Sequence, residues 1–312
     1  MAQRFLISRL SALGDVVCSL PAAVALKRAM PDCHVTWAVD PRFAGIVECC
    51  TVVDEIVRCK PGFKPATWPE FSDGFDAALD LQGLLKSAAC VARANAPRKL
   101  GYHWQREGSA LFSAQVLPDA SSFHIVDQYV DVARAAGGEM DRAEFALAPV
   151  AEDVESVRGK LAAAGVAGTF VAMNAGAGWI TKRWPPSSFA VLISALKSRG
   201  VQTVVLGAKG ADQEAVAAIA SEGARFADLS GKTSVRELVA LLSLASAHVG
   251  GDTGSTHVMA ALGRPAIGLY SITRPRRSCP YGQIERCVYK PTALCDISPD
   301  EVLPLVLDAV GV

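Results

Sequence analysis

The segment of this chain best suited to chemistry is Gly250-Gly251-Asp252-Thr253-Gly254-Ser255-Thr256-His257. The apolar residues 245–249 precede it, and small residues from Thr256 to Leu262 predict a helix after it. Backbone N–H groups at the start of a helix are unpaired and lie at the positive end of the helix dipole, so they bind anions, most often phosphate. An ordinary turn whose Asp or Ser caps the helix explains the same residues. On this segment alone the two interpretations are equally good.

A carboxylate at the start of another helix is the second candidate. The apolar strand Phe5–Ile7 leads into the loop Ser8–Asp15, and a helix is predicted from about Val16 to Met30. The loop has one glycine, Gly14, and therefore lacks the G-x-G-x-x-G pattern of oxidoreductase dinucleotide sites. Asp15 follows that glycine, and its side chain has two candidate roles: a helix cap, which the spacing favours, or a catalytic carboxylate.

Basic residues gather between Leu81 and Arg106, where five occur without an acidic one. They are Lys86, Arg93, Arg98, Lys99 and Arg106, and Lys60 and Lys64 lie in the preceding loop. Arginine and lysine side chains pair with phosphate and carboxylate, so this group suits an anionic substrate. For any one of them alone, a solvated surface position is the simpler explanation. The neighbouring Tyr102, His103 and Trp104 either form a face for stacking a sugar or belong to the core.

The segment from Asn174 to Pro185 offers a further phosphate site. Its glycines would let a diphosphate approach the backbone, and Lys182 and Arg183 would neutralise its charge. A loop with a solvated basic pair is the alternative. Downstream, Asp212 or Glu214 could accept hydrogen bonds from a ribose, although carboxylates are common at helix starts for electrostatic reasons.

The elements that must position these residues alternate between strands and helices. In the first half, strands are predicted at residues 5–7, 34–39, 52–57 and 77–81, and helices at about 16–30 and 84–94, with Pro21 expected to kink the first helix or delay its start. This alternation predicts right-handed crossovers and a parallel sheet, in which ligands sit at the carboxyl ends of the strands. We therefore expect Ser8–Asp15 and Gln82–Lys86 at the same edge of that sheet.

The second half repeats the pattern. After a linker at 146–152 and a helix at 153–164, strands are predicted at 170–174, 203–206, 247–249 and 266–269, with helices at about 187–199, 211–221 and 235–244. The predicted fold class is α/β, with two doubly wound Rossmann-like domains facing one another, at residues 1–150 and 151–312. The last helix, at 299–310, either stays with the second domain or packs back on the first.

Composition excludes several classes of protein. The 312 residues carry no net charge, and residues 1–150 hold 15 basic and 17 acidic side chains, so neither half is a basic nucleic-acid module. No apolar run reaches the length of about 18 residues that predicts a transmembrane helix. The nine cysteines are odd in number and include no C-x-x-C pair, which favours reduced thiols in the cytoplasm over disulfides or a zinc site.

Five segments occur in an order typical of one family. They are Ser11-Ala12-Leu13-Gly14-Asp15, Asp80-Leu81-Gln82-Gly83-Leu84-Leu85-Lys86-Ser87-Ala88, Lys182-Arg183-Trp184-Pro185, Ser230-Gly231-Lys232-Thr233-Ser234 and Asp252-Thr253-Gly254-Ser255-Thr256-His257. On these motifs the chain resembles the ADP-heptose:lipopolysaccharide heptosyltransferases of glycosyltransferase family 9 and is most similar to heptosyltransferase I. The resemblance covers nearly the whole chain.

The resemblance implies the GT-B fold, with the acceptor bound by the first domain and the donor nucleotide by the second. It implies an inverting, metal-independent transfer of heptose from ADP-heptose, the donor substrate, to a Kdo sugar of the lipopolysaccharide inner core, with Asp15 as the general base. No cofactor and no metal are expected, in agreement with the absence of a D-x-D triplet. The donor-binding residues are expected to be Lys182, Gly178, Thr233, Asp252, Thr253, Gly254 and His257. Those expected at the anionic, lipid-linked acceptor are Gly14, Gln82, Lys86, Lys60, Lys64 and Arg106.

The sequence departs from the family pattern at two places. Heptosyltransferase I has a Thr pair shortly before the lysine, where this chain has Ala177-Gly178, so backbone contacts to phosphate would replace hydroxyl contacts. The late G-P-T-D-P motif appears as Tyr270-Ser271-Ile272-Thr273-Arg274-Pro275. The alternatives are another nucleotide sugar or acceptor, a nucleotide-sugar epimerase on the same scaffold, or a non-catalytic sugar- or lipid-binding protein. The family's acceptor implies a cytoplasmic protein, with peripheral contact at the inner face of the cytoplasmic membrane as one possibility.

Overall fold

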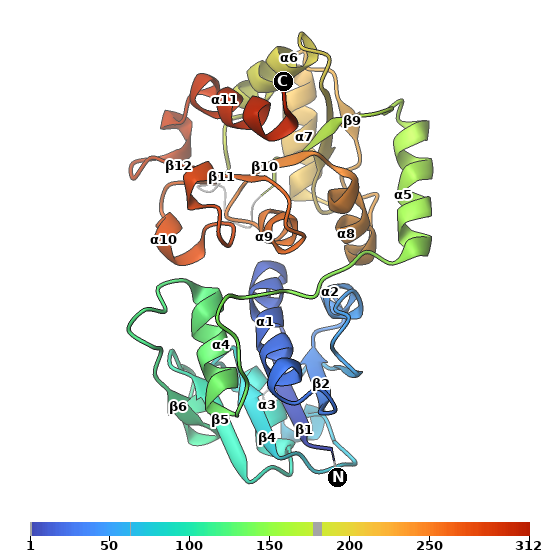
Figure 1. Cartoon of the computed structure of the whole chain (residues 1–312). Helices are drawn as coiled ribbons and strands as arrows, with labels where there is room; N and C mark the ends of the chain where they lie inside the picture. Colours follow the sequence, from blue (N-terminus) through green and yellow to red (C-terminus); the bar gives the residue numbers. More distant parts are fainter. Residues whose placement is uncertain (1, 63, 177–182) are drawn as a thin grey trace. The chain divides into compact units, whose positions relative to one another are not determined.

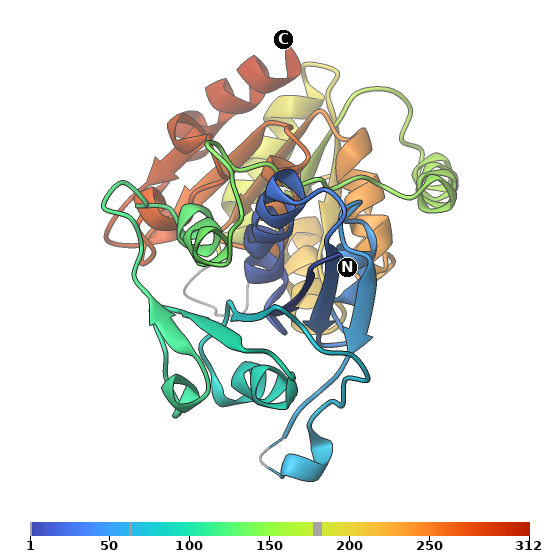
Figure 2. The same cartoon turned by 60° about the horizontal axis from the view of Figure 1, so that its bottom comes forward.

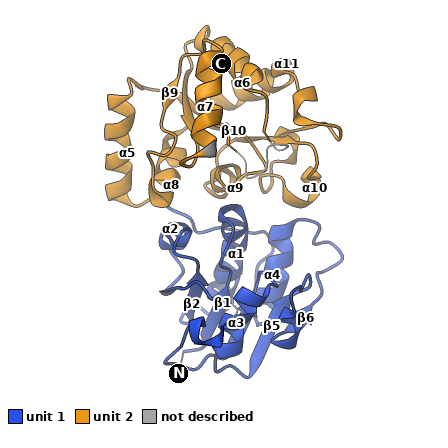
Figure 3. Ribbon diagram, turned by 180° about the vertical axis from the view of Figure 1, so that it is seen from behind, with its two compact units in different colours: residues 1–148 blue, residues 149–312 orange. Residues whose placement is uncertain are grey.

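The computed structural model describes residues 2–62, 64–176 and 183–312 of the chain. The chain forms two compact units, Met1–Ala148 and Pro149–Val312, called unit 1 and unit 2 below (Figure 3). The boundary between them falls within the segment 146–152, at the Ala148-Pro149 pair.

Unit 1 is built on six parallel strands in the order β3-β2-β1-β4-β5-β6 (Figure 1). The strands are β1 Arg4–Ser8, β2 His34–Val39, β3 Glu55–Arg58, β4 Ala77–Asp80, β5 Arg98–Tyr102 and β6 Ala114–Val116. The helices are α1 Leu13–Ala29, α2 Ala44–Glu48, α3 Leu85–Arg93 and α4 Ile125–Ala135, with short 3-10 turns η1 Pro65–Thr67 and η2 Ser109–Leu111. Helices α1 and α4 cover one face of the sheet and α3 covers the other (Figure 2). The strand order reverses between β1 and β4, the position at which doubly wound sheets bind ligands.

Helix α1 begins earlier than the sequence predicts. Its first residue is Leu13 rather than Val16, because the Asp15 carboxylate accepts the N–H of Ala12 and stabilises the first turn. The helix continues through Pro21, so the expected delay of its start is wrong. Every residue of α1 from Val16 to Leu26 is buried, and α4 packs beside the helix on the same face of the sheet.

Several smaller elements of unit 1 differ from the prediction or were missed. Strand β3 begins at Glu55 rather than Val52, because Thr51 and Val52 form a turn. The strands β5 and β6 were not predicted, since β5 starts with two charged residues and β6 has only three residues. Helix α4 was also missed, although its buried residues recur at the helical period and could have been recognised.

Unit 2 repeats the architecture with six parallel strands in the order β12-β11-β10-β7-β8-β9. The strands are β7 Phe170–Asn174, β8 Gln202–Leu206, β9 Ala227–Asp228, β10 Ala247–Gly251, β11 Ala266–Tyr270 and β12 Cys287–Tyr289. The helices are α5 Ala151–Ala163, α6 Pro186–Lys197, α7 Ala211–Ser221, α8 Val235–Leu244, α9 Gly254–Ala261, α10 Pro275–Ser278 and α11 Pro299–Val310, with 3-10 turns η4 Ile284–Arg286 and η5 Leu294–Asp296. The strand order of this sheet reverses between β7 and β10. The edge strands β9 and β12 were not predicted, because each has no more than three residues.

The last helix, α11, packs within unit 2 on α6 and the strands β10 and β11 (Figure 1). Val302 and Val306 belong to the buried core of this unit. The indole N–H of Trp184 donates to the carbonyl of Ile297 at 2.9 Å, which fixes the chain just before α11. Among the helices in the described part of the chain, none has both the length and the apolar character needed to cross a membrane.

Candidate functional site

The loops that follow β1 and β4 lie together at the point where the sheet of unit 1 reverses its order. The strands end side by side, with Ser8 in register with Asp80. The side-chain oxygen of Gln82 accepts the N–H groups of Leu10 at 3.0 Å and Ser11 at 3.3 Å. The ammonium of Lys86 donates to the hydroxyl of Ser11 at 2.8 Å. The prediction that Ser8–Asp15 and Gln82–Lys86 share one edge is therefore confirmed.

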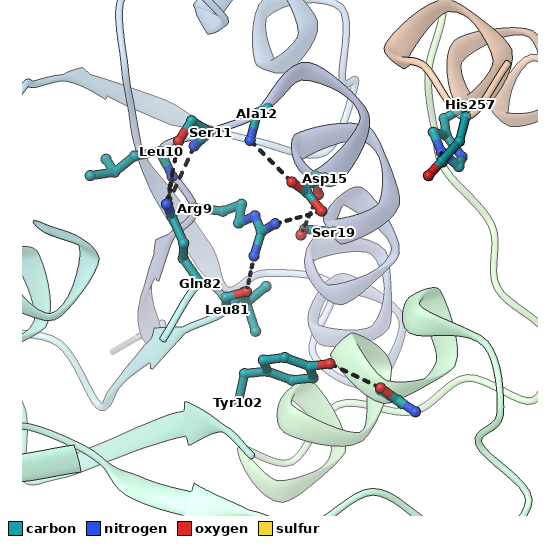
Figure 4. A network of polar contacts seen from close by, with 12 residues as sticks. Arg9, Leu10, Ser11, Ala12, Asp15, Ser19, Leu81, Gln82, Tyr102 and His257 are labelled. Atoms are coloured by element: carbon teal, nitrogen blue, oxygen red, sulfur yellow. Dashed lines mark hydrogen bonds and ion pairs between the residues drawn. The ribbon is translucent and has the colours of Figure 1, made fainter. Parts of the chain in front are cut away.

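Asp15 lies in the first turn of α1, directly after the partly buried Gly14, and 49% of its side chain is exposed (Figure 4). Its Oδ2 accepts the N–H of Ala12 at 3.2 Å, and its Oδ1 is 2.8 Å from Nη2 of Arg9. The capping interpretation of Asp15 is thus confirmed. Capping leaves room for a second role, because a carboxylate has about four lone-pair sites and half of this side chain faces solvent.

The partner of Asp15, Arg9, is buried at the end of β1, with 6% of its side chain exposed. Its Nη1 donates to the carbonyl of Leu81, and its guanidinium carbon lies 5.1 Å from the centre of the Tyr129 ring. Sequence reasoning gave Arg9 no role. The available signal was a charged residue placed between the strand residues 5–7 and the apolar Leu10.

The buried carboxyl group of Asp80 shapes the turn after β4. Burial raises its pKa above the ordinary value, although the N–H groups of Gly83 at 2.9 Å and Gln82 at 3.0 Å donate to its Oδ1. Gly83 has a φ of +69°, and a Cβ atom there would lie 2.5 Å from the carbonyl oxygen of Trp104. Only glycine fits this turn, which holds Gln82 in place.

The loop after β5 brings Arg106 to the same edge. Its N–H donates to the carbonyl of Gly83 at 2.8 Å, and its guanidinium carbon lies 5.5 Å from the centre of the Trp104 indole. Of the neighbouring aromatic residues, Tyr102 is in the core, where its hydroxyl donates to Gln128 at 3.0 Å. Trp104 is 50% exposed. Tyr102 therefore belongs to the core, whereas Trp104 is exposed and can offer a face for stacking.

Lys60 and Lys64 lie apart from this network. Both are exposed and belong to the segment between β3 and β4, which is held by Arg93 through the carbonyl of Pro65 at 3.1 Å and by an edge-to-face contact of Trp68 with Phe112. Within residues 2–62 and 64–176, neither lysine forms a hydrogen bond with Gln82, Lys86 or Ser11.

In unit 2, the glycine-rich segment 250–257 lies at the corresponding reversal of strand order. Strand β10 ends at Gly251 and α9 begins at Gly254, two residues earlier than predicted. The N-cap residue is Thr253, whose side chain accepts no hydrogen bond from the helix backbone, so the alternative of an Asp or Ser cap is wrong. An uncapped helix start of this kind keeps N–H groups available to an anion.

Side chains from both central strands hold this helix start. The side-chain N–H of Asn174, at the end of β7, donates to the hydroxyl of Ser255 at 2.8 Å. The Nε2 of His248, from β10, lies 3.0 Å from the same hydroxyl. Thr256 donates to the carbonyl of Gly251 at 2.7 Å. Burial, together with the charge of His257, lowers the pKa of His248 to about 3, so this imidazole is neutral at pH 7.

The remaining donor candidates fall into three groups. His257 and Asp252 lie together, with Nε2 of the histidine 3.3 Å from Oδ1 of the aspartate, and both are largely buried. Thr233 is partly buried and directly precedes Ser234, the N-cap of α8. Lys182 and Gly178 lie outside the described residues.

The end of β8 and the start of α7 carry the two carboxylates considered for a ribose. Asp212 accepts the N–H of Ala208 at 2.8 Å and lies 3.7 Å from Nη2 of Arg183. Glu214 lines a pocket of about 370 Å³ in unit 2. The other lining residues are Ala175, Arg183, Trp184, Pro185, Pro186, Phe189, Ala215 and Ile219. In the described ranges, no three His, Cys, Asp or Glu side chains are grouped as a metal site requires.

Comparison with known proteins agrees with this arrangement. The model of glycosyltransferase family 9 (heptosyltransferase) matches residues 71–299. The lipopolysaccharide heptosyltransferase 1 of Salmonella typhimurium is 29% identical over 308 residues, which cover 92% of this chain and 94% of that protein.

Two solved structures share the fold. The glycosyl transferase family 9 protein of Veillonella parvula has a TM-score of 0.86 at 18% identity, over 99% of this chain and 97% of that one. The E. coli heptosyltransferase WaaC with ADP has a TM-score of 0.80 at 24% identity, over 98% and 100%. The predicted α/β fold of GT-B type, with doubly wound Rossmann-like units, is confirmed. Because the family model matches well over half of the chain, the chain belongs to glycosyltransferase family 9, a family of heptosyltransferases.

Proposed function

We propose that this protein transfers heptose from ADP-heptose to a Kdo sugar of the lipopolysaccharide inner core. Membership of family 9 and the similarity to the lipopolysaccharide heptosyltransferase 1 of Salmonella typhimurium support this reaction. The observation that carries the mechanism is the half-exposed carboxylate of Asp15, fixed by two contacts at the ligand-binding edge of unit 1.

In this proposal Asp15 is the general base. It takes the proton of an acceptor hydroxyl as the oxygen attacks the anomeric carbon of the heptose, on the face opposite the diphosphate. The bond from that carbon to the diphosphate breaks and ADP leaves, so the configuration at the carbon inverts. General-base catalysis of this kind contributes about 10²–10⁴-fold, and the sugar passes through an oxocarbenium-like transition state.

The departing ADP requires positive charge near its diphosphate. The start of α9 supplies backbone N–H groups and the helix dipole, and Lys182 and Arg183 supply formal charge. The proposed transfer uses no divalent metal and no cofactor, which agrees with the lack of a D-x-D triplet. Full activity in EDTA is the expected result.

The anionic acceptor is proposed to bind at unit 1. Gln82 and Lys86 hold the loop before Asp15, Gly14 allows close approach, and Arg106 lies over the half-exposed Trp104. Lys60 and Lys64 would bind a more distant anionic part of the same acceptor, such as its phosphates. Because that acceptor is lipid-linked, peripheral contact with the inner face of the cytoplasmic membrane is part of the proposal.

The donor identity can be tested with a panel of ADP-, UDP- and GDP-sugars. Each is added to the purified protein and the melting temperature is measured, since a ligand that binds the native state raises it. We expect the largest increase with ADP-heptose, followed by transfer to a Kdo-terminated acceptor detected by mass spectrometry. A larger increase with a UDP- or GDP-sugar would contradict the donor assignment. Conversion of ADP-heptose without an acceptor would indicate an epimerase instead.

A further inference from the structure

A buried cation lies directly beneath the proposed base. Only 6% of the Arg9 side chain is exposed, against 49% for Asp15, so the ion pair runs from the core of unit 1 to its surface (Figure 4). A buried charge is unfavourable unless it is paired, and a structural role at this position could be filled by an apolar side chain. The burial of Arg9 beside Asp15 therefore indicates a functional role for this arginine.

Three contacts hold the guanidinium of Arg9. Its Nη1 donates to the carbonyl of Leu81, its central carbon lies 5.1 Å from the centre of the Tyr129 ring, and its Nη2 is 2.8 Å from Oδ1 of Asp15. The Arg9 backbone is fixed as well, because the indole N–H of Trp37 donates to its carbonyl at 3.3 Å. A guanidinium held in this way can in turn hold the Asp15 carboxylate in one position.

The two contacts of Asp15 leave its carboxylate in one orientation. Arg9 holds Oδ1 and the N–H of Ala12 holds Oδ2, while 49% of the side chain stays exposed, so the carboxylate keeps lone pairs for a further partner.

Among the titratable side chains around Arg9, Asp15 is its ion-pair partner. The titratable side chains that face it are Tyr129 from α4, Cys18 from α1, Asp80 from β4 and Asp15 itself. Burial raises the pKa of Tyr129 well above its ordinary value, and burial also raises that of Asp80. Among the described residues, Asp15 is the one carboxylate within ion-pair distance of Arg9.

We propose that Arg9 is a positioning residue that holds the carboxylate of Asp15 in the orientation needed at the acceptor hydroxyl. The proposal rests on the proposed role of Asp15 as the general base. It assigns to Arg9 no contact with substrate, so its effect must reach the reaction through Asp15 alone.

The test compares Arg9→Met, Arg9→Lys and a matched control in the full-length protein. The control is Arg28→Met, which removes the same charge from an ion pair with Glu144 at 2.7 Å, at the last turn of α1. For each protein, kcat and the KM for the acceptor are measured for transfer from ADP-heptose to a Kdo-terminated acceptor. The dissociation constant of ADP is measured by titration.

Arg9→Met is expected to lower kcat by about 10²-fold, because Asp15 is no longer held in place. The KM for the acceptor should stay close to the wild-type value, because Arg9 makes no contact with substrate in this proposal. Arg9→Lys should lower kcat less, since the lysine keeps a donor for Asp15 but lacks the planar fork. ADP affinity should be unchanged in both, and Arg28→Met should behave as wild type.

Two results would overturn the role of Arg9: a wild-type kcat in Arg9→Met, or a wild-type kcat in Arg9→Lys. The second result decides the matter even if Arg9→Met does not fold. Asp15→Asn separates this question from the base assignment. If Asp15→Asn retains wild-type turnover, the base assignment itself fails. If Asp15→Asn is inactive, adding Arg9→Met should cause no further loss, and an additional loss would show that Arg9 acts independently of Asp15.

Discussion

At the scale of single residues, the carboxylate of Asp15 has a structural role that is compatible with its proposed role as the general base. It caps α1 through Ala12, pairs with the buried Arg9, and still presents half of its side chain to solvent. Removing it leaves the Arg9 charge buried without a partner, a change that costs about 3–5 kcal/mol in buried pairs and less here because Asp15 is half exposed. Asp15→Asn is therefore a better probe of chemistry than Asp15→Ala, because the amide oxygen still accepts from Arg9.

The buried His248 predicts a pH dependence of stability. Its pKa is about 3 in the folded protein and 6.5 in the unfolded chain. Below pH 6.5 the unfolded chain binds a proton that the folded protein does not, so the stabilisation is complete above pH 6.5 and is lost as the pH falls toward 3. The free energy of unfolding should fall by about 1.4 kcal/mol per pH unit in this window.

His248→Asn isolates this contribution. Urea unfolding between about pH 5 and about pH 7, a span in which ordinary carboxylates stay ionised, should show a flatter pH dependence for the variant than for wild type. Glu237, whose pKa is lowered to about 2 by the hydrogen bond from Lys160 against the opposing effect of burial, affects stability only below about pH 4.5 and leaves this span unaffected. Identical slopes for the two proteins would contradict a neutral buried His248.

At the scale of elements, the turn from β4 to α3 supports the loop that leads to Asp15, the proposed base. The Gly83→Ala variant should lose both stability and transfer activity, because Gly83 has a φ of +69° and its added Cβ would lie 2.5 Å from the Trp104 carbonyl. The displaced turn would also carry Gln82 away from the N–H groups of Leu10 and Ser11. Chemical unfolding and the transfer assay measure the two effects.

Gly165→Ala is the matched control for this variant. Gly165 has a φ of +73°, and a Cβ atom added there would meet no other atom within 4 Å, so the backbone penalty of about 1–2 kcal/mol is present without a clash. The control should retain wild-type turnover. If both variants lose the same stability and keep activity, the close contact at Gly83 has no role in the site.

At the scale of the whole molecule, each unit has the same strand order and carries its candidate site at the same topological position. The proposed division of labour predicts where a nucleotide binds. Hydrogen exchange of the full-length protein with ADP should slow most in the segment 250–262 of unit 2, since binding suppresses local opening. The segment 8–20 of unit 1 should change less. The strongest protection at 8–20 would contradict the assignment of the donor to unit 2.

Much of this architecture could be predicted from the sequence. The bounds of β2, β7, α7, α8 and α11 agree with the predicted ones, because their apolar residues follow a clear period and end at turn residues. The shared edge of Ser8–Asp15 and Gln82–Lys86 followed from the carboxyl ends of parallel strands.

The pairing of Arg9 with Asp15 could not be predicted, because it depends on Leu81 and Tyr129 from distant parts of the chain. Local sequence likewise could not separate Tyr102 from Trp104, since burial is decided by tertiary packing. The substrates were suggested by the order of the motifs and not by any periodicity. The roles of Lys182 and Gly178, which lie outside the described residues, also rest on that resemblance.

The central claim is that the carboxylate of Asp15 removes the acceptor proton while unit 2 binds the nucleotide. The most direct measurement combines the turnover of Asp15→Asn with a titration of ADP, using Lys182→Ala for comparison. We predict that Asp15→Asn lowers kcat by about 10²–10⁴-fold with unchanged ADP affinity, whereas Lys182→Ala weakens ADP binding. Wild-type turnover in Asp15→Asn would contradict the account.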